Sequence, residues 1–194
     1  MVFNQCFSEI LALDDAGEKM NLMQEYGVET LQKFMQKYGV ETVQYYIKYF
    51  QNAIEELDIK IRKIETAIRN LKAEAKDSEQ LQIQNNCHNC TKHLRQLYYI
   101  KNSISRYNDV KSNLLEARRV FSETVLLFTN IEIGIRDWQD EQAAVLLKNQ
   151  FTQLRRLIDE KLLTNLEKNG KSLPLVTIEE IEGMYLLLQS QTNF

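Results

Sequence analysis

Proline and glycine are scarce in this chain, whose 194 residues include one proline and six glycines. Turn-dense folds such as β-sandwiches and barrels need many more of both residues, because tight turns join their short strands. The composition therefore predicts helices with few connections. Because 44% of the residues are apolar, the chain can bury one substantial core, and we expect a single helical domain over residues 1–194.

An excess of positive charge is also missing, since the formal net charge is −3. Proteins that bind nucleic acids usually carry a basic stripe or a high isoelectric point, so we expect no nucleic-acid partner. The adjacent pairs Arg118-Arg119 and Arg155-Arg156 fit long side chains that lie along a helix surface with their charged ends in water.

No stretch of the sequence reaches the roughly 18 uninterrupted apolar residues of a transmembrane helix. The first residues, MVFNQCFSEILALDD, have no basic segment and soon become acidic, which does not predict a secretory signal. Three cysteines, an odd number, fit a reducing compartment better than a set of disulfides. We therefore expect a cytoplasmic protein that has no membrane partner.

The clearest pattern in the sequence places an apolar residue at every third or fourth position from Val43 to Ala75. An unbroken period of about 3.5 residues over this length predicts a helix that coils around one or more other helices. The residues in between carry charges of both signs, as expected of a solvated face. The predicted interaction seam consists of Ile47, Phe50, Ile54, Leu57, Ile61, Ile64, Ile68 and Leu71.

Two further long helices follow this seam. The apolar pattern stops near Ala75, which predicts a turn between residues 76 and 88, and a second break is expected between residues 134 and 137. Gly170 is expected to end the third helix in a left-handed conformation. Because short turns make consecutive long helices antiparallel, the predicted fold class is all-α, an elongated antiparallel bundle with three long coiled-coil-like helices over residues 40–170.

Short helices are predicted at both ends of the bundle. The sequence YGVET occurs at residues 26–30 and again at 38–42, and each glycine predicts a helix stop. Residues 1–39 are therefore expected to form short N-terminal helices. Near the other end, Thr177 and Glu180 match a capping box, which predicts a C-terminal helix over residues 177–189.

Residues 87–93, CHNCTKH, contain both histidines of the chain and two of its three cysteines. Two thiolates and an imidazole can ligate zinc, which makes Cys87, Cys90 and His93 candidate metal ligands. Alternatively, cysteines three positions apart can form a redox dithiol. A third interpretation needs no cofactor at all: both cysteines are small, half-buried residues near a turn.

The same seven residues resemble the motif of the all-helical alkylhydroperoxidase-like family, in which Cys-x-x-Cys is followed by a histidine. The resemblance implies a thiol-based redox role for Cys87 and Cys90. In that family three residues separate the second cysteine from the histidine, whereas two residues separate Cys90 from His93.

Other catalytic motifs are absent from the sequence. It has no glycine-rich phosphate loop, no Gly-x-Ser-x-Gly elbow and no Glu-x-x-His pair. The tyrosine pairs at 45–46 and 98–99 are expected to straddle the boundary of the core. We predict a non-enzymatic adaptor or scaffold without a resident cofactor, which binds another protein or itself, for instance as a homodimer. The alternative is a metal- or redox-linked helical protein that uses Cys87, Cys90 and His93.

Overall fold

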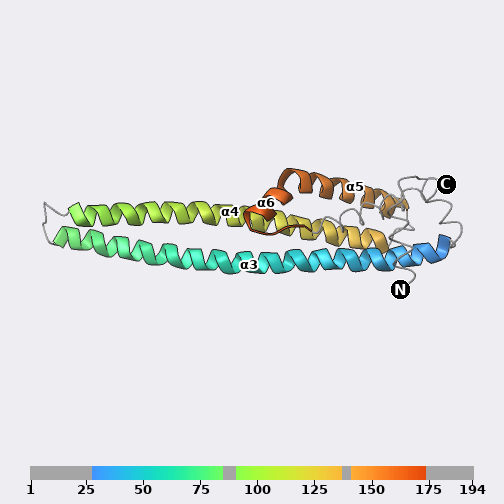
Figure 1. Cartoon of the computed structure of the whole chain (residues 1–194), viewed down its shortest axis with the longest axis horizontal. Helices are drawn as coiled ribbons and strands as arrows, with labels where there is room; N and C mark the ends of the chain where they lie inside the picture. Colours follow the sequence, from blue (N-terminus) through green and yellow to red (C-terminus); the bar gives the residue numbers. More distant parts are fainter. Residues whose placement is uncertain (1–27, 85–90, 137–140, 174–194) are drawn as a thin grey trace. The chain divides into compact units, whose positions relative to one another are not determined.

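The computed structural model of the protein describes residues 28–84, 91–136 and 141–173 (Figure 1). The described residues are helical almost throughout and contain no strand, which confirms the all-α fold class. Two long helices, α3 (Val28–Gln84) and α4 (Thr91–Arg136), come first. They are followed by α5 (Glu141–Leu157), one π-helical turn (Ile158–Leu162) and α6 (Leu163–Lys168).

The helices contribute to two compact units. The first, Asn52–Ser122, contains parts of α3 and α4 and is called the two-helix unit below. The second combines Met1–Gln51 with Glu123–Phe194 and is called the terminal unit. It contains the rest of α3 and α4 together with α5 and α6.

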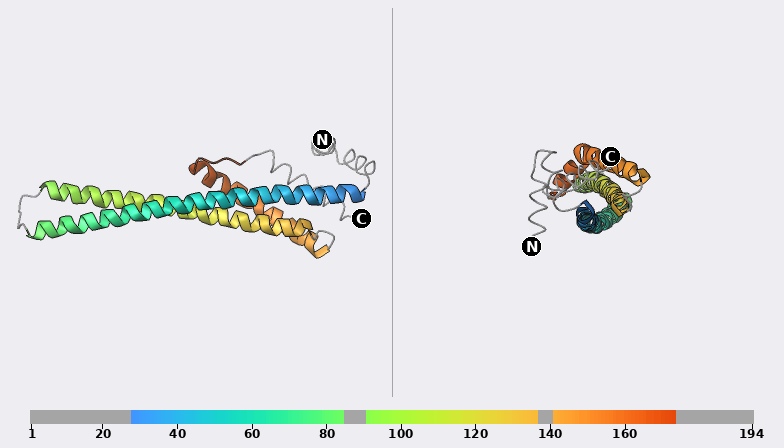
Figure 2. Two further views of the ribbon diagram at one scale, coloured as in Figure 1. Left: turned by 90° about the horizontal axis from the view of Figure 1, so that it is seen from below. Right: turned by 90° about the vertical axis from the view of Figure 1, so that its right-hand side faces the viewer.

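The two long helices are antiparallel within the two-helix unit, where Figures 1 and 2 show them side by side. Asp58 pairs with Arg118, Glu65 with Lys111, and Glu79 with Lys101, so residue numbers rise along α3 as they fall along α4. Leu57, Ile61 and Ile68 of α3 are buried in this unit, as are Leu97, Ile100, Leu114 and Ala117 of α4. The predicted antiparallel packing of consecutive long helices is confirmed for this pair.

The buried stripe of α3 differs from the predicted seam at two places. Tyr46 and Ala53 are fully buried, whereas their neighbours Ile47 and Ile54 are only half-buried. From Ala53 the stripe takes two successive steps of four, to Leu57 and Ile61. Because an α-helix has 3.6 residues per turn, a strict 3.5-residue seam drifts around the helix, and such a pair of steps corrects the drift.

The expected helix stop at Gly39 is wrong, because Gly39 is buried inside α3, which already begins at Val28. A glycine inside a helix costs about 1 kcal/mol relative to alanine, and the packing of a long apolar stripe can offset that cost. The short helices expected over residues 1–39 are therefore not found at 28–39. Residues 1–27 and the C-terminal helix expected at 177–189 lie outside the described residues.

The other predicted boundaries agree better with the structure. The α3 helix ends at Gln84, inside the interval expected for the first turn, and α4 ends at Arg136, inside the interval of the second break. The third helix includes a π-helical turn that the apolar pattern did not predict. Gly170 has a φ of 65°, which confirms the left-handed stop that follows α6.

Aromatic rings form the centre of the terminal unit. The rings of Tyr46 and Phe128 are stacked with their centroids 4.9 Å apart, and the Phe50 ring lies 6.2 Å from that of Phe128. All three side chains are almost completely buried. The tyrosine pair at 45–46 thus straddles the core boundary as predicted, because Tyr45 is exposed.

We expect Phe128→Ala to lower the free energy of unfolding by about 3–5 kcal/mol, because it removes the ring that both other aromatic side chains contact. Leu126→Ala is the matched control on the same helix, since Leu126 is 60% exposed. The control should change stability by less than about 0.5 kcal/mol. Urea unfolding followed by circular dichroism measures both values, and similar losses for the two variants would contradict the assigned core.

The α4 and α5 helices approach each other closely at Gly134 in the terminal unit. A Cβ atom at this position would lie 3.0 Å from Leu147 Cδ1 and 3.2 Å from Leu147 Cβ. Nearby, the Asn130 amide donates a hydrogen bond of 3.4 Å to Gln150 Oε1. The two contacts show that α5 runs antiparallel to α4, and that the absence of a side chain at 134 permits the close packing.

Gly134→Val should therefore destabilise the terminal unit by about 1–3 kcal/mol, because the new methyl groups overlap Leu147. Valine has a slightly better helix propensity than glycine, so intrinsic propensity would act in the opposite direction. Ser122→Val, at an exposed position of α4, controls for a β-branched residue in this helix. Thermal unfolding monitored by calorimetry tests the prediction, which fails if Gly134→Val is as stable as the unmodified protein.

Candidate protein-interaction surface

The predicted chemical cluster is only partly described. His93 lies in the first turn of α4 and is half-buried, while Cys87 and Cys90 lie outside the described residues. Within the described ranges, no three histidine, cysteine, aspartate or glutamate side chains come close enough to hold a metal ion. Zinc binding and dithiol chemistry at Cys87, Cys90 and His93 therefore stay predictions.

The zinc hypothesis makes a definite prediction about protein purified without chelators. It should contain about one zinc ion per chain, and Cys90→Ser should lose the metal, because a thiolate ligand is removed. A closed zinc site has four ligands, so Cys6→Ser tests whether the third cysteine of the chain supplies the fourth. Elemental analysis combined with thiol titration tests the zinc hypothesis. Metal-free protein with three freely reacting thiols would contradict it.

Contacts within the chain bury the predicted seam wholly or in part. Phe50, Leu57, Ile61 and Ile68 are buried, and the other four seam residues, Ile47, Ile54, Ile64 and Leu71, are half-buried. In the two-helix unit the buried members face α4, the other helix that the structure describes there. A surface that remains available to another protein must therefore be sought on the flanks of the two helices.

Large apolar side chains remain exposed on those flanks, mainly on α4. A pair of helices can bury only one stripe of each helix, so apolar residues outside that stripe stay in water. Tyr99 is 68% exposed, Tyr98 65% and Leu94 55%, which corrects the expectation that the 98–99 pair straddles the core boundary. Among the side chains that the structure describes in this unit, the other large apolar ones that are exposed are Ile59, Tyr107, Val110 and Leu115.

One edge of the two-helix unit, called the paired edge here, is lined by ion pairs. Lys101 Nζ lies 3.3 Å from Glu79, Lys111 Nζ lies 2.6 Å from Glu65, and Arg118 Nε lies 2.6 Å from Asp58. The three acidic residues are separated by whole heptads along α3, so they share one side of that helix. Because each pair is exposed or half-exposed, it contributes little to the free energy of folding. The pairs are more important for the register between α3 and α4.

The Arg118–Asp58 pair has the most complete geometry. Arg118 Nε donates to Asp58 Oδ1 at 2.6 Å, and Nη2 donates to Oδ2 at 3.5 Å. The hydrogen bond and the negative charge of Asp58 raise the pKa of Arg118 above its usual value. Because its pKa is raised, Arg118 is charged at neutral pH and loses its proton only when the pH rises beyond the ordinary arginine range.

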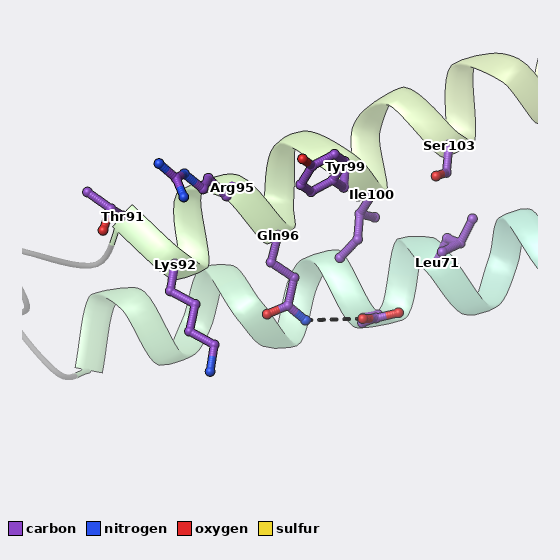
Figure 3. Close-up of a pocket in the computed structure, with 9 residues that line it drawn as sticks. Leu71, Thr91, Lys92, Arg95, Gln96, Tyr99, Ile100 and Ser103 are labelled. Atoms are coloured by element: carbon purple, nitrogen blue, oxygen red, sulfur yellow. Dashed lines mark hydrogen bonds between the residues drawn. The ribbon is translucent and has the colours of Figure 1, made fainter.

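The opposite edge, called the open edge here, contains a groove of about 530 Å³ (Figure 3). Leu71 of α3 and Ile100 of α4 point toward each other at its base, and the Gln96 amide reaches across it to Glu74 at 3.2 Å. Lys92, Arg95, Tyr99 and Ser103 of α4 line the remainder of the groove, together with Thr91.

The charge of this part of α4 is one-sided. From Thr91 to residue 108 the helix has no aspartate or glutamate but contains Lys92, Arg95, Lys101 and Arg106. Lys101 pairs with Glu79, whereas the other three cations form no ion pair with any residue that the structure describes. Because the chain is acidic as a whole, its net charge gives no indication of this local basic surface. The acid-free stretch is visible in the sequence and could have revealed it.

The fold and this surface define an all-α protein whose two-helix unit is a pair of long antiparallel helices packed against each other. No family model matches the chain, and neither a curated protein nor a solved structure shows significant similarity to it. None of the described helices combines the length and apolar character needed to cross a membrane.

Proposed function

We propose that this chain is a non-enzymatic, cytoplasmic helical-bundle protein that binds other proteins through α4 of its two-helix unit. The observation that carries the proposal is the group of three large side chains, Leu94, Tyr98 and Tyr99, each more than half exposed within six residues. Tyrosine is enriched at the centres of protein interfaces, where single residues can contribute 2 kcal/mol or more to binding.

The geometry of the unit supports this role. Two helices in contact leave most of each helix surface open, and that surface is held in a fixed register by the buried seam and the ion pairs of the paired edge. A preorganised helical surface binds with a smaller loss of conformational entropy than a flexible segment. Helices packing into grooves between other helices are a common mode of such recognition. An adaptor or scaffold role follows from these properties.

The triple variant Leu94→Gln, Tyr98→Gln and Tyr99→Gln tests the proposal. We expect it to reduce partner binding by at least about tenfold, because the loss of even 1.4 kcal/mol has that effect. The matched control replaces three exposed polar residues of the same helix, through Asn102→Gln, Ser105→Gln and Asn108→Gln. Cross-linking in cells that express each full-length form, followed by mass spectrometry, identifies proteins bound by the unmodified chain and the control but lost from the triple variant.

Light scattering on the same proteins separates binding of a different protein from self-association. A mass above that of one 22.9 kDa chain that falls to the monomer value in the triple variant assigns the surface to a homo-oligomer. Identical cross-linked partners and identical masses for all three forms would contradict the proposal. Circular dichroism should show unchanged helix content, since all substituted residues are exposed.

A further inference from the structure

We infer that the partner contributes an acidic amphipathic α-helix, which packs along the open edge of the two-helix unit in contact with both α3 and α4. The inference rests on the proposed function and specifies the chemistry of the partner. Four observations carry it: the difference between the two edges, the shape of the groove, the spacing of the residues around it and their charge.

The first observation is that the two edges of the unit are closed to different extents. Three ion pairs join α3 to α4 on the paired edge. At the groove on the open edge, the two helices are joined by the hydrogen bond from the Gln96 amide to Glu74. The paired edge therefore uses its charges within the chain, whereas the open edge leaves charges and apolar area available.

The second observation is the apolar groove on this edge. Leu71 is half-buried and Ile100 is buried at its base, and the exposed ring of Tyr99 stands beside them (Figure 3). A helix that packs here can insert side chains between α3 and α4 at the usual interaxial distance of about 8–10 Å. Such packing would bury the Tyr99 ring and complete a three-helix arrangement.

The third observation is the spacing of residues along α4. Lys92, Tyr99 and Arg106 are separated by seven residues each, so they occupy the same heptad position. Val110, which is 46% exposed, follows the groove residue Ser103 by one further heptad. Tyr99 therefore lies between two cations that are about four helical turns apart, and Val110 adds exposed apolar area about one turn beyond Arg106. This length suits one amphipathic helix.

The fourth observation is charge, and it selects the partner. Lys92, Arg95 and Arg106 form no ion pair with the described residues, so glutamates on the flanks of a docked helix would gain three charge partners. A second copy of the same edge would bring these cations close to their own kind, which disfavours self-association there. A nucleic acid would meet the same cations, but it would also meet Glu74 and an apolar base that phosphates do not match.

The test uses the full-length protein and a labelled helical peptide of about 21 residues, with leucine at its seam positions and glutamate on the flanks. The matched peptide carries lysine in place of every glutamate, and a 20-nucleotide single-stranded oligouridylate is the nucleic-acid probe. Fluorescence anisotropy at about 50 and 300 mM salt measures the affinities. We expect the acidic peptide to bind at least about tenfold more tightly than the lysine peptide, with the difference shrinking at high salt.

Variants of the protein assign the site. Tyr99→Gln and the double variant Lys92→Glu with Arg106→Glu should each weaken the acidic peptide at least about tenfold, and the double variant should gain affinity for the lysine peptide. Lys161→Glu with Lys168→Glu changes the net charge equally at two exposed positions of the terminal unit and should leave binding unchanged. Circular dichroism confirms that each variant keeps its helix content.

Three results would overturn the inference. Equal binding of both peptides would exclude charge selection, and tighter binding of the oligouridylate, lost in the double variant, would assign the edge to nucleic acid. The third result would come from a photo-cross-linking amino acid placed in cells either at Ser103 or at Tyr98. The inference fails if the amino acid at Ser103 captures no acidic helical segment while the one at Tyr98 captures a partner. In that case protein binding stands as proposed, but it uses the outer face of α4 rather than the open edge.

Discussion

The antiparallel contact between the apolar stripes of α3 and α4 is the interaction on which the rest of the structure depends. Isolated helices of most sequences are only marginally stable in water, and burial of an amphipathic face supplies most of their stability. The stripe of α3 includes Val43, Leu57, Ile61 and Ile68. The buried residues of α4 include Ile100, Leu114 and Phe121. Register between the helices decides which side chains become core, which become edge and which stay in water.

The two units differ in how much of the sides of their long helices is buried. In the terminal unit, α5 packs against α4 at Gly134, and the stacked rings of Tyr46 and Phe128 fill the centre. A third helix there broadens the buried face of α4, on which Leu127, Phe128 and Ile131 are all buried. In the two-helix unit α4 packs against α3 alone among the described helices of that unit, and Tyr98 and Tyr99 are exposed to water.

The asymmetry of the two-helix unit connects its structure to its proposed role. Three ion pairs join the helices across one edge, whereas Lys92, Arg95 and Arg106 form no ion pair with any described residue. Ion pairs in water contribute little to stability, and their more important effect here is to hold one register and one face toward solvent. The opposite face combines exposed aromatic area with a local positive charge that the acidic composition of the whole chain hides.

The sequence by itself determined the helical fold class, the stripe of α3 from Leu57 to Ile68, the end of α4 near Arg136 and the left-handed stop at Gly170, because periodicity and glycine conformation act locally. Only the tertiary structure decided that Gly39 continues a helix, that Tyr46 rather than Ile47 is fully buried, and that Tyr98 and Tyr99 are exposed. A residue on an apolar flank is buried only if another helix covers it. The presence of that helix depends on contacts between residues far apart in the chain, which no local pattern encodes.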